Sequence, residues 1–430
     1  MLPLLWHNQD LAALIPKRGY HQEDLDRIED ALAKHGTLTM RPLASGLFPA
    51  AAVGVSAAGT GYGKVWVRDN VYVAYAHYRC GQSEIAGRTA RALLEFFAKH
   101  RRRFEAIIEG EVDANDVMNR PHIRFDGETL EELTGEHWAH AQNDALGYAL
   151  WLFAKLADAG VLPLDARTAE TLTLFPRYFA AIHYWQDEDS GHWEETRKRS
   201  ASSIGVVVAG LEALHALGGR LAAAGVEPQV VDLAADLAKR GRAALGAILP
   251  SECVQPSPRQ NRRYDAALLF LVYPLGVVAP PMADLILSDI DHFLQGEVGV
   301  RRYLGDSYWA PDYDERLPPE DLCRDFSQDM ETRDVLLERI GDEAQWCIFD
   351  PILSAYYGQR FCESAAAGDL ERQTHHFERA LAHIMPAWQC PELYYRKHGA
   401  FAPNPHAPLL WTQANLTIAL SAIRASVANR

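Results

Sequence analysis

Cysteine is scarce in this chain, and no two cysteines lie at a spacing that would indicate a disulfide framework. The 430 residues include six scattered cysteines without a CxxC pair. Small secreted domains that depend on disulfides are much denser in cysteine. The N-terminus has no basic residue before Lys17, and its apolar run is too short for a signal-peptide core. We therefore expect a cytoplasmic protein that folds in a reducing compartment.

Basic residues and long hydrophobic runs are also in short supply. Lys and Arg number 42 against 57 Asp and Glu, so the formal net charge is −15. An acidic chain repels nucleic acid and anionic membranes, and we expect neither as a partner. Residues 266–283 carry no charge, but Pro274, Gly276 and Pro280 interrupt them. A neutral ligand such as a sugar suits this composition.

Metal and nucleophile motifs are missing as well. His375 and His376 are adjacent, so they do not lie on the same face of a helix, as two histidines at positions i and i+4 would. The spacing of His122, His137 and His140 matches no metal signature. No serine lies in a nucleophile-elbow pattern. We predict that the chain uses neither a metal nor a cofactor.

What the sequence does contain is helical periodicity along most of its length. The segments that we expect to be helical are residues 22–34, 69–79, 83–103, 138–158, 165–185, 200–217, 228–249, 265–275, 282–294, 343–367, 370–384 and 407–428. Long loops are expected between them, including a Gly/Ala/Ser loop at 53–63, and no run is strong enough to predict a sheet.

About twelve helices in consecutive pairs predict an all-α fold, the six-hairpin (α/α)6 barrel, with a site built from the long loops on one rim. A helical solenoid is the competing architecture, but we find no fixed-period repeat. No stretch resembles a linker, so we expect a single domain over residues 1–430.

The stretch Gly191-His192-Trp193-Glu194-Glu195 carries the strongest chemical signal. Trp193 offers a flat apolar face for a sugar ring, and a carboxyl beside such a face is partly desolvated. Desolvation raises the pKa of a carboxyl, so that it can donate a proton to a leaving oxygen near neutral pH. The alternative is a solvated acidic turn that precedes the next helix.

Three other segments combine aromatic and charged residues. Trp66 precedes Arg68 and Asp69 at a predicted helix start, where a guanidinium and a carboxylate could bridge vicinal sugar hydroxyls. The segment 138–144 places polar residues before an apolar helix, and the loop 301–309 holds two arginines, an aspartate and three aromatics. The alternatives are a capping Asp with a structural ion pair for the first segment, capping for the second, and a loop anchored by its aromatics for the third. A lone carboxylate, Glu392, precedes two tyrosines on a predicted loop, where a surface role is the alternative.

Taken in order, these segments resemble the catalytic domain of glycoside hydrolase family 15, the glucoamylases and their relatives. The resemblance looks closest to the glucoamylase-like region of phosphorylase kinase α and β subunits. The residues that carry it are Trp66 to Tyr72, Trp138 to Asp144, Gly191 to Glu194, Ala201 to Ser203, Arg302 to Tyr308, Glu343 to Trp346, Pro391 to Tyr394 and Pro408 to Trp411.

The resemblance implies roles for individual residues. Glu194 matches the general acid, Glu392 the general base and Glu195 a neighbour that holds the aglycone side. The positions that match sugar-binding or pocket-lining residues are Trp66, Arg68, Asp69, Trp138, Asp144, Trp193, Arg302 and Asp306. Two departures, His140-Ala141 in place of Arg-Pro and Gly305 in place of an acidic residue, concern the subsite for the second sugar.

The expected function is exo-hydrolysis with inversion, which releases glucose from the non-reducing end of α-glucosides or short α-glucans. Two alternatives remain. A glycoside phosphorylase of the same barrel type would replace the activated water by phosphate. A non-catalytic glucan-binding or regulatory module would bind oligosaccharide without turnover. Two candidate carboxylates favour an enzyme, because a binding site needs neither acid nor base.

Overall fold

Six helices that are buried on most sides form the centre of the molecule. The computed structural model describes residues 4–51, 61–257 and 260–430. The central helices are α3 (Val67–Arg79), α6 (Asn143–Asp158), α8 (Ala201–Ala216), α11 (Leu269–Val272), α15 (Phe349–Ser364) and α17 (Leu410–Ala428). In chain order α3 contacts α6, α6 contacts α8, and α8 contacts α11, while α15 contacts α17 and α17 returns to α3. These helices therefore form an inner ring.

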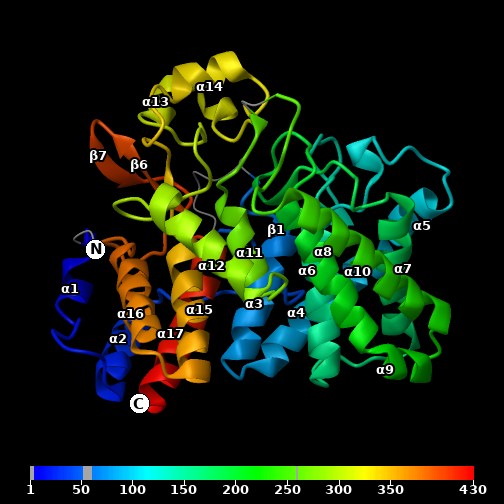
Figure 1. Ribbon diagram of the computed structural model, residues 1–430, viewed down its shortest axis with the longest axis horizontal. Coiled ribbons are helices and arrows are strands. Elements are labelled where there is room, and N and C mark those ends of the chain that lie inside the picture. The colour runs from blue at the N-terminus through cyan, green and yellow to red at the C-terminus, as the bar shows by residue number, and fades with distance from the viewer. Residues whose placement is uncertain (1–3, 52–60, 258–259) are drawn as a thin grey trace.

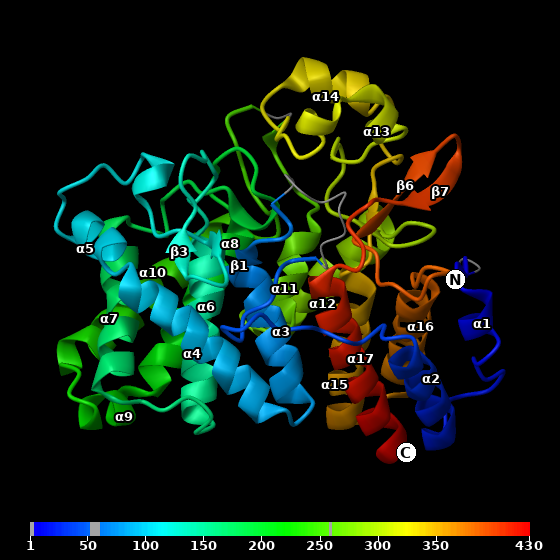
Figure 2. The same cartoon turned by 180° about the vertical axis from the view of Figure 1, so that it is seen from behind.

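A second set of helices surrounds this ring. The outer helices are α2 (Gln22–Lys34), α4 (Ser83–Lys99), α7 (Ala166–Ala181), α10 (Pro228–Ile248), α12 (Pro280–Asp289) and α16 (Ala367–Ala382). They are amphipathic, as α2 shows by burying Leu25, Ile28 and Leu32 on one face. Outer and inner helices alternate along the chain, which is the expected (α/α)6 barrel. Figures 1 and 2 show the helices side by side, with the long connecting segments gathered at one end and short links at the other.

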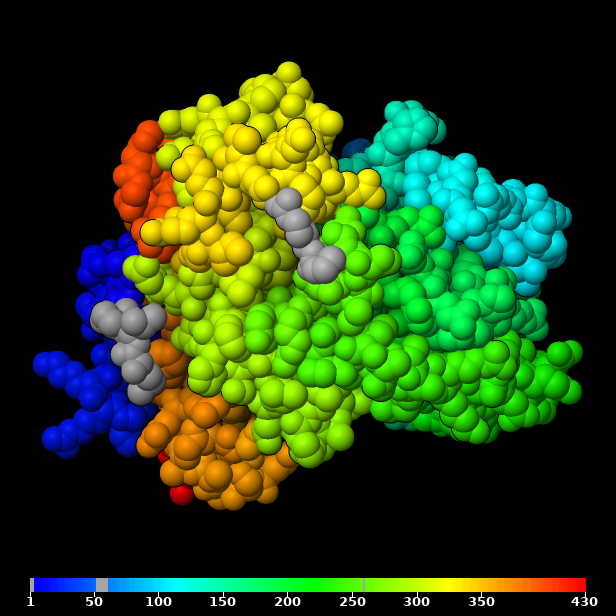
Figure 3. All heavy atoms as spheres, turned by 45° about the horizontal axis from the view of Figure 1, so that its top comes forward, coloured from blue at the N-terminus to red at the C-terminus, as the bar shows by residue number. Residues whose placement is uncertain are grey.

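Shorter helices decorate the barrel. They are α1 (Gln9–Ala12), α5 (Arg102–Ile108), α9 (Gly218–Ala223), α13 (Tyr313–Arg316) and α14 (Met330–Leu336), with single turns at Val117–Asn119, Gly191–Trp193, Ala266–Leu268, Pro319–Asp321 and Ile290–Leu294. The segment that carries α13 and α14 lies on top of the loop end, and its atoms form part of the upper surface in the space-filling view (Figures 1 and 3).

Two small antiparallel sheets lie among the loops. One orders β1 (Val65–Trp66), β2 (Arg124–Asp126) and β3 (Glu131–Glu132), and the other orders β4 (Val300–Arg301), β5 (Gln345–Trp346), β6 (Leu393–Lys397) and β7 (Ala400–Pro403). In the second sheet Trp346 pairs with Leu393. The expectation that no sheet forms was wrong, because strands of two to five residues are too short to show a period of two.

Helix boundaries follow the sequence where apolar periodicity sets them. The expected helix 22–34 coincides with α2, whereas α6 begins at Asn143 and not at Trp138. Likewise α15 begins at Phe349, because residues 345–346 pair in β5. Of the expected loop at 53–63, residues 53–60 lie outside the described residues, and residues 61–63 belong to neither a helix nor a strand. Among the described helices, none has the length and apolar character to cross a membrane.

Candidate active site

The loop end of the barrel holds a cavity of about 620 Å³. All but one of the residues that the sequence singled out line it, namely Trp66, Arg68, Asp69, Trp138, Trp193, Glu194, Glu195, Arg302, Asp306 and Glu392. The exception is Asp144, which is fully buried behind Arg68. The cavity therefore brings together side chains from segments that are more than 300 residues apart.

Two helix starts border this cavity. Its lining includes residues in or directly before the first turns of α3 and α17. The N-terminal end of a helix carries a partial positive charge from its unpaired N–H groups. The inner ring therefore directs two such ends toward one space, which suits a site that contains carboxylates.

Glu194 sits at the end of the turn Gly191–Trp193, in a left-handed backbone conformation with φ of 60°. For a non-glycine residue this conformation costs about 1–3 kcal/mol and is typical of functional sites. The backbone N–H groups of Glu194 and Glu195 donate to Gly191 and Ser190, which fixes the turn. Burial raises the pKa of Glu194 to about 7, the direction that the sequence argument predicts.

Arg68 holds Glu194 in place. Its Nη1 lies 3.3 Å from Glu194 Oε1, and its Nε donates to Asp144 Oδ2 at 2.8 Å. Nη2 donates to Gln142 Oε1 at 2.7 Å and to the carbonyl of Gly191 at 3.2 Å. Asp144 therefore positions the guanidinium from behind, and the first turn of α6 supports the first turn of α3. The positive charge of Arg68 opposes the rise in the Glu194 pKa without cancelling it.

Asp69, the next residue on α3, also faces the cavity. Desolvation raises its pKa to about 7, against the lowering effect of Arg68. The influence of Glu392 adds to the rise, and Asp69 in turn raises the pKa of Glu194. The ionisation of Asp69 is therefore coupled to both candidate catalytic residues, because a negative charge on Asp69 is close enough to be repelled by Glu194 and by Glu392.

Glu195 points into a different environment from Glu194. Tyr303 Oη donates to Glu195 Oε1 at 2.6 Å, and Arg262 Nη2 donates to Oε2. Arg302 Nη2 lies 3.5 Å from Oε1, and Lys198 Nζ lies 3.8 Å from Oε2. These cations outweigh burial and lower the pKa of Glu195 to about 2. Glu195 is therefore a fixed negative charge in a buried ion network.

Arg302 and Asp306 form a two-point ion pair within their loop. Nε and Nη2 of Arg302 lie 2.7 and 2.8 Å from the two carboxylate oxygens of Asp306. The guanidinium lies 5.3 Å from the ring centre of Trp193 and 5.0 Å from that of Trp346. Trp193 is itself anchored, because its Nε1 donates to Asp265. The aromatic wall of the cavity is thus rigidly packed around a cation.

Trp66 and Trp138 form another part of the cavity lining. Their rings meet edge to face at 5.5 Å, and the guanidinium of Arg124 lies 3.7 Å from the ring centre of Trp138. Arg124 pairs with Glu136. Residues 138–142, expected to be helical, form an irregular segment before α6, so the sequence placed Trp138 in the site but on the wrong element.

Glu392 lies directly before β6 and is held from both sides. Tyr62 Oη donates to Glu392 Oε1 at 2.7 Å, and Asn404 Nδ2 donates to Oε2. Asn404 follows β7, so the hairpin returns it beside Glu392. Tyr62 stacks on His406 with ring centres 3.9 Å apart. These donors leave Glu392 with neutral partners, whereas Glu194 and Glu195 contact arginines.

Tyr62 and Asn404 are the residues that the sequence argument missed. Tyr62 lies in a glycine-rich stretch without periodicity, and Asn404 is brought to Glu392 only by strand pairing. Tyr308, within the loop that the sequence did single out, adds a hydroxyl 3.4 Å from that of Tyr62. Of metal-type clusters among the described residues, Asp312, Glu315 and His398 come within reach of one another, and none of the three lines the cavity.

Comparison with known proteins identifies the family. The model of glycosyl hydrolases family 15 matches residues 32–308, which is more than half of the chain. The chain therefore belongs to glycosyl hydrolases family 15. A probable phosphorylase b kinase regulatory subunit alpha of Drosophila melanogaster is 25% identical over 408 residues, which is 86% of this chain. The chain spans between 21% and 30% of the length of the curated relatives it matches.

Solved structures agree on the architecture. A structure named as a wild-type glycosidase has a TM-score of 0.69 at 20% identity, over 95% of this chain and 100% of that one. A glucoamylase from Saccharomycopsis fibuligera has a TM-score of 0.61 at 12% identity, over 97% and 99% of the two chains. At identities this low, the structural likeness establishes the fold alone. It confirms the expected (α/α)6 barrel.

Proposed function

We propose that this chain is an exo-acting glycoside hydrolase that releases glucose from the non-reducing end of α-glucosides or short α-glucans, with inversion. The observation that carries the proposal is the pair Glu194 and Glu392. Both line one cavity, and their surroundings differ in the way that an acid and a base require. Neighbouring titratable groups in different environments are the usual sign of assigned acid and base roles.

Glu194 acts as the general acid in this proposal. With a pKa of about 7, a large fraction of its carboxyl groups is protonated at neutral pH. The left-handed turn and Arg68 orient the carboxyl, so that its proton can pass to the glycosidic oxygen as the bond to the sugar breaks. The leaving sugar is thereby released as a neutral alcohol.

Glu392 acts as the general base. Its two oxygens are held by Tyr62 and Asn404, which donate to the carboxylate and so orient it. The carboxylate removes a proton from a water that attacks the anomeric carbon on the face opposite the leaving group. Attack from that face inverts the anomeric configuration, so an α-glucoside yields β-glucose.

Ion pairs around the cavity bind the sugar. Arg68 and Asp69 present a guanidinium and a carboxyl side by side, and Arg302 and Asp306 do so on the loop 301–309. Charge-assisted hydrogen bonds from such pairs fix vicinal hydroxyls with directional specificity. Trp138 and Trp193 supply apolar faces against which the ring can pack.

Turnover on a panel of sugars tests the proposal. Maltose, isomaltose, trehalose, maltotriose and a soluble glucan would be incubated with the wild-type chain, Glu194→Gln and Glu392→Gln, and glucose release would be followed. Release by the wild type that is lost in both variants, with unchanged thermal unfolding, supports it. Equal rates in wild type and both variants would overturn it.

A second candidate is a regulatory module that binds glucan without turnover, and the names of the curated relatives favour it. Each is a phosphorylase b kinase regulatory subunit alpha. This candidate predicts saturable oligosaccharide binding by calorimetry with no glucose release from any sugar of the panel. It also predicts that Glu194→Gln leaves the binding constant unchanged.

A further inference from the structure

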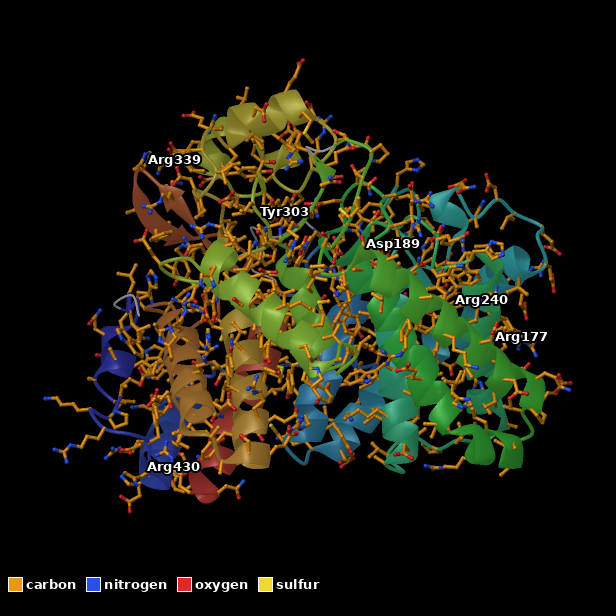
Figure 4. All side chains as sticks on the ribbon, viewed as in Figure 1. Arg177, Asp189, Arg240, Tyr303, Arg339 and Arg430 are labelled. Carbon is orange, nitrogen blue, oxygen red and sulfur yellow. The ribbon has the colours of Figure 1, made fainter. Side chains whose placement is uncertain are left out.

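A second, smaller cavity of about 60 Å³ lies next to the main one. The two share lining residues, among them Thr196, Tyr303 and Ser327. Tyr303 is seen in Figure 4 within the loop layer, between the barrel helices and the segment of α13 and α14. Thr196 follows the two glutamates directly, so the small cavity lies on the Glu195 side of the site.

The small cavity is lined by cations and amides. Four of its described lining residues are cationic, namely Arg197, Lys198, Arg262 and Arg333, and Gln255, Gln260 and Asn261 add amide groups. No carboxylate occurs among the described residues that line it. The lining of the small cavity is therefore positively charged, whereas the whole chain has a net charge of −15.

The carboxylates near these cations are shared among several of them. Arg333 donates to the carbonyls of Ser327 and Gly305. Lys198 Nζ donates to the carbonyl of Thr196 at 3.3 Å and lies 3.8 Å from Glu195, a carboxylate that Arg262 also binds. Arg197 donates to two backbone carbonyls and lies 3.5 Å from Asp187, a carboxylate that Arg120 already binds through both oxygens. The positive charge of the cavity is therefore only partly compensated.

Arg262 supplies a second, independent observation. It is 9% exposed, and its buried Nη1 has no hydrogen-bond partner, with Asp265 Oδ2 at 3.6 Å as its nearest ion-pair contact. Its other nitrogen, Nη2, binds Glu195. Burial and the nearby charge of Arg262 lower the pKa of Lys198, as expected where two positive charges lie close together away from solvent. A buried guanidinium with an unused donor needs an acceptor to offset its desolvation.

We propose that this cavity binds a tetrahedral oxyanion of the phosphate type. The anion is either a phosphate ester on the aglycone unit of the substrate or free inorganic phosphate. Neither residue that hydrogen-bonds Glu392, Tyr62 or Asn404, lines the small cavity. The anion therefore sits on the leaving-group side and not where a nucleophile would attack, which separates this site from phosphorolysis.

Calorimetric titration of inorganic phosphate into the full chain, at constant ionic strength set with sodium chloride, tests the site without any need for turnover. We expect saturable binding that Arg333→Gln and Lys198→Met each weaken by about ten- to a hundredfold, since each removes one charge-assisted contact. The matched control is Arg339→Gln, because the Arg339 side chain is 78% exposed and lies at the outer edge of the molecule (Figure 4).

Two results would overturn the proposal. One is the absence of saturable phosphate binding to the wild-type chain. The other is binding that Arg333→Gln and Lys198→Met leave as strong as in Arg339→Gln. Thermal unfolding of each variant shows that it is folded. The second variant, Lys198→Met, is a check in case Arg333→Gln weakens phosphate binding only by displacing residues 323–328, which Arg333 contacts through the carbonyl of Ser327. Failure of the proposed hydrolysis would leave the phosphate titration unaffected.

The source of the anion is distinguished by a second comparison, which rests on the proposed function. A glucosyl disaccharide and its form phosphorylated on the reducing sugar would be assayed with and without phosphate. A phosphate-ester ligand predicts a KM about tenfold lower for the phosphorylated sugar, with inorganic phosphate as a competitor. A free-phosphate ligand predicts that phosphate changes the rate on the plain disaccharide, while the phosphorylated sugar gains nothing. Identical kinetics in every arm would overturn an anion role in turnover.

Discussion

Glu194 and Glu195 are neighbours in the chain and opposites in the structure. Glu194 contacts one cation, Arg68, and burial raises its pKa to about 7. Glu195 contacts Arg262, Arg302, Lys198 and the hydroxyl of Tyr303, and its pKa falls to about 2. One residue is poised to exchange a proton near neutral pH, and the other is a permanent charge.

The difference shows that the ionisation of each glutamate depends on the side chains it contacts, and that the backbone turn determines which side chains those are. The left-handed conformation at Glu194 sends consecutive side chains in different directions, one toward α3 and one toward the loop of Arg302. A buried carboxyl with few cations tends to keep its proton, whereas a buried carboxyl in an ion network loses it. Chemistry and structural support are thus divided between two adjacent glutamates.

Substitution of Glu194 should have the largest effect on activity. We expect Glu194→Gln to reduce kcat/KM on an active α-glucoside by about 10²–10⁴, because the amide has no acidic proton to donate. The measurement is steady-state glucose release. The matched control is Glu188→Gln, an exposed glutamate shortly before the same turn, which should retain wild-type activity. Loss of activity in both would indicate damage to the turn and not to the acid.

Substitution of Glu195 should affect the fold instead. Glu195→Gln leaves buried Arg262 and Arg302 without part of their charge partner, and removing one member of a buried ion pair costs about 3–5 kcal/mol. We expect denaturant titration to show that loss in the free energy of unfolding, which Glu194→Gln should not show. Equal unfolding free energies for Glu195→Gln and Glu188→Gln would contradict the ion network.

The pH dependence of stability should distinguish Glu194 from its neighbour. Its pKa rises from 4.5 to about 7 on folding, so the folded state binds the proton more tightly than the unfolded chain. The wild type should therefore lose stability relative to Glu194→Gln as the pH rises through that window, on the order of 1–3 kcal/mol. Unfolding at pH 4.5 and pH 8 measures the difference. A constant difference between the two proteins across this window would contradict the raised pKa.

The smallest expected effect is on the alkaline limb of the pH–rate profile. In the wild type, kcat/KM should fall as the pH rises through about 7, because the acid loses its proton. Arg68 lowers the pKa of Glu194, so Arg68→Gln should move this limb to higher pH while it reduces the rate. Arg102→Gln, at a side chain that is 59% exposed, is the control. A limb that stays in place would show that Arg68 does not tune the acid.

The barrel was predictable because its signals are local and repeated. Apolar residues at helical spacing gave the twelve barrel helices, and α2 and α10 end within a residue of the expected positions. The two small sheets were missed because short strands carry little pattern and form through contacts between distant segments. Glu392 illustrates this, since its segment was expected to be a loop and is followed by β6.

The candidate site was partly predictable for a similar reason. Aromatic and charged residues in one segment, as at Trp193 and Glu194, are visible in the chain. Tyr62 and Asn404 were not, because each meets Glu392 only in the folded protein. Asp144 was expected to contact sugar and instead lies behind Arg68, a distinction that depends on which way a buried side chain points.

The central claim is that Glu194 donates a proton while Glu392 activates a water on the opposite face of the sugar. Proton NMR of the glucose released in the first minutes of reaction tests it most directly, on whichever α-glucoside the wild-type chain cleaves. Our account predicts that β-glucose appears first and that the α-anomer grows in only by mutarotation. Initial release of α-glucose would contradict it, because retention requires a covalent glycosyl intermediate in place of direct attack by water.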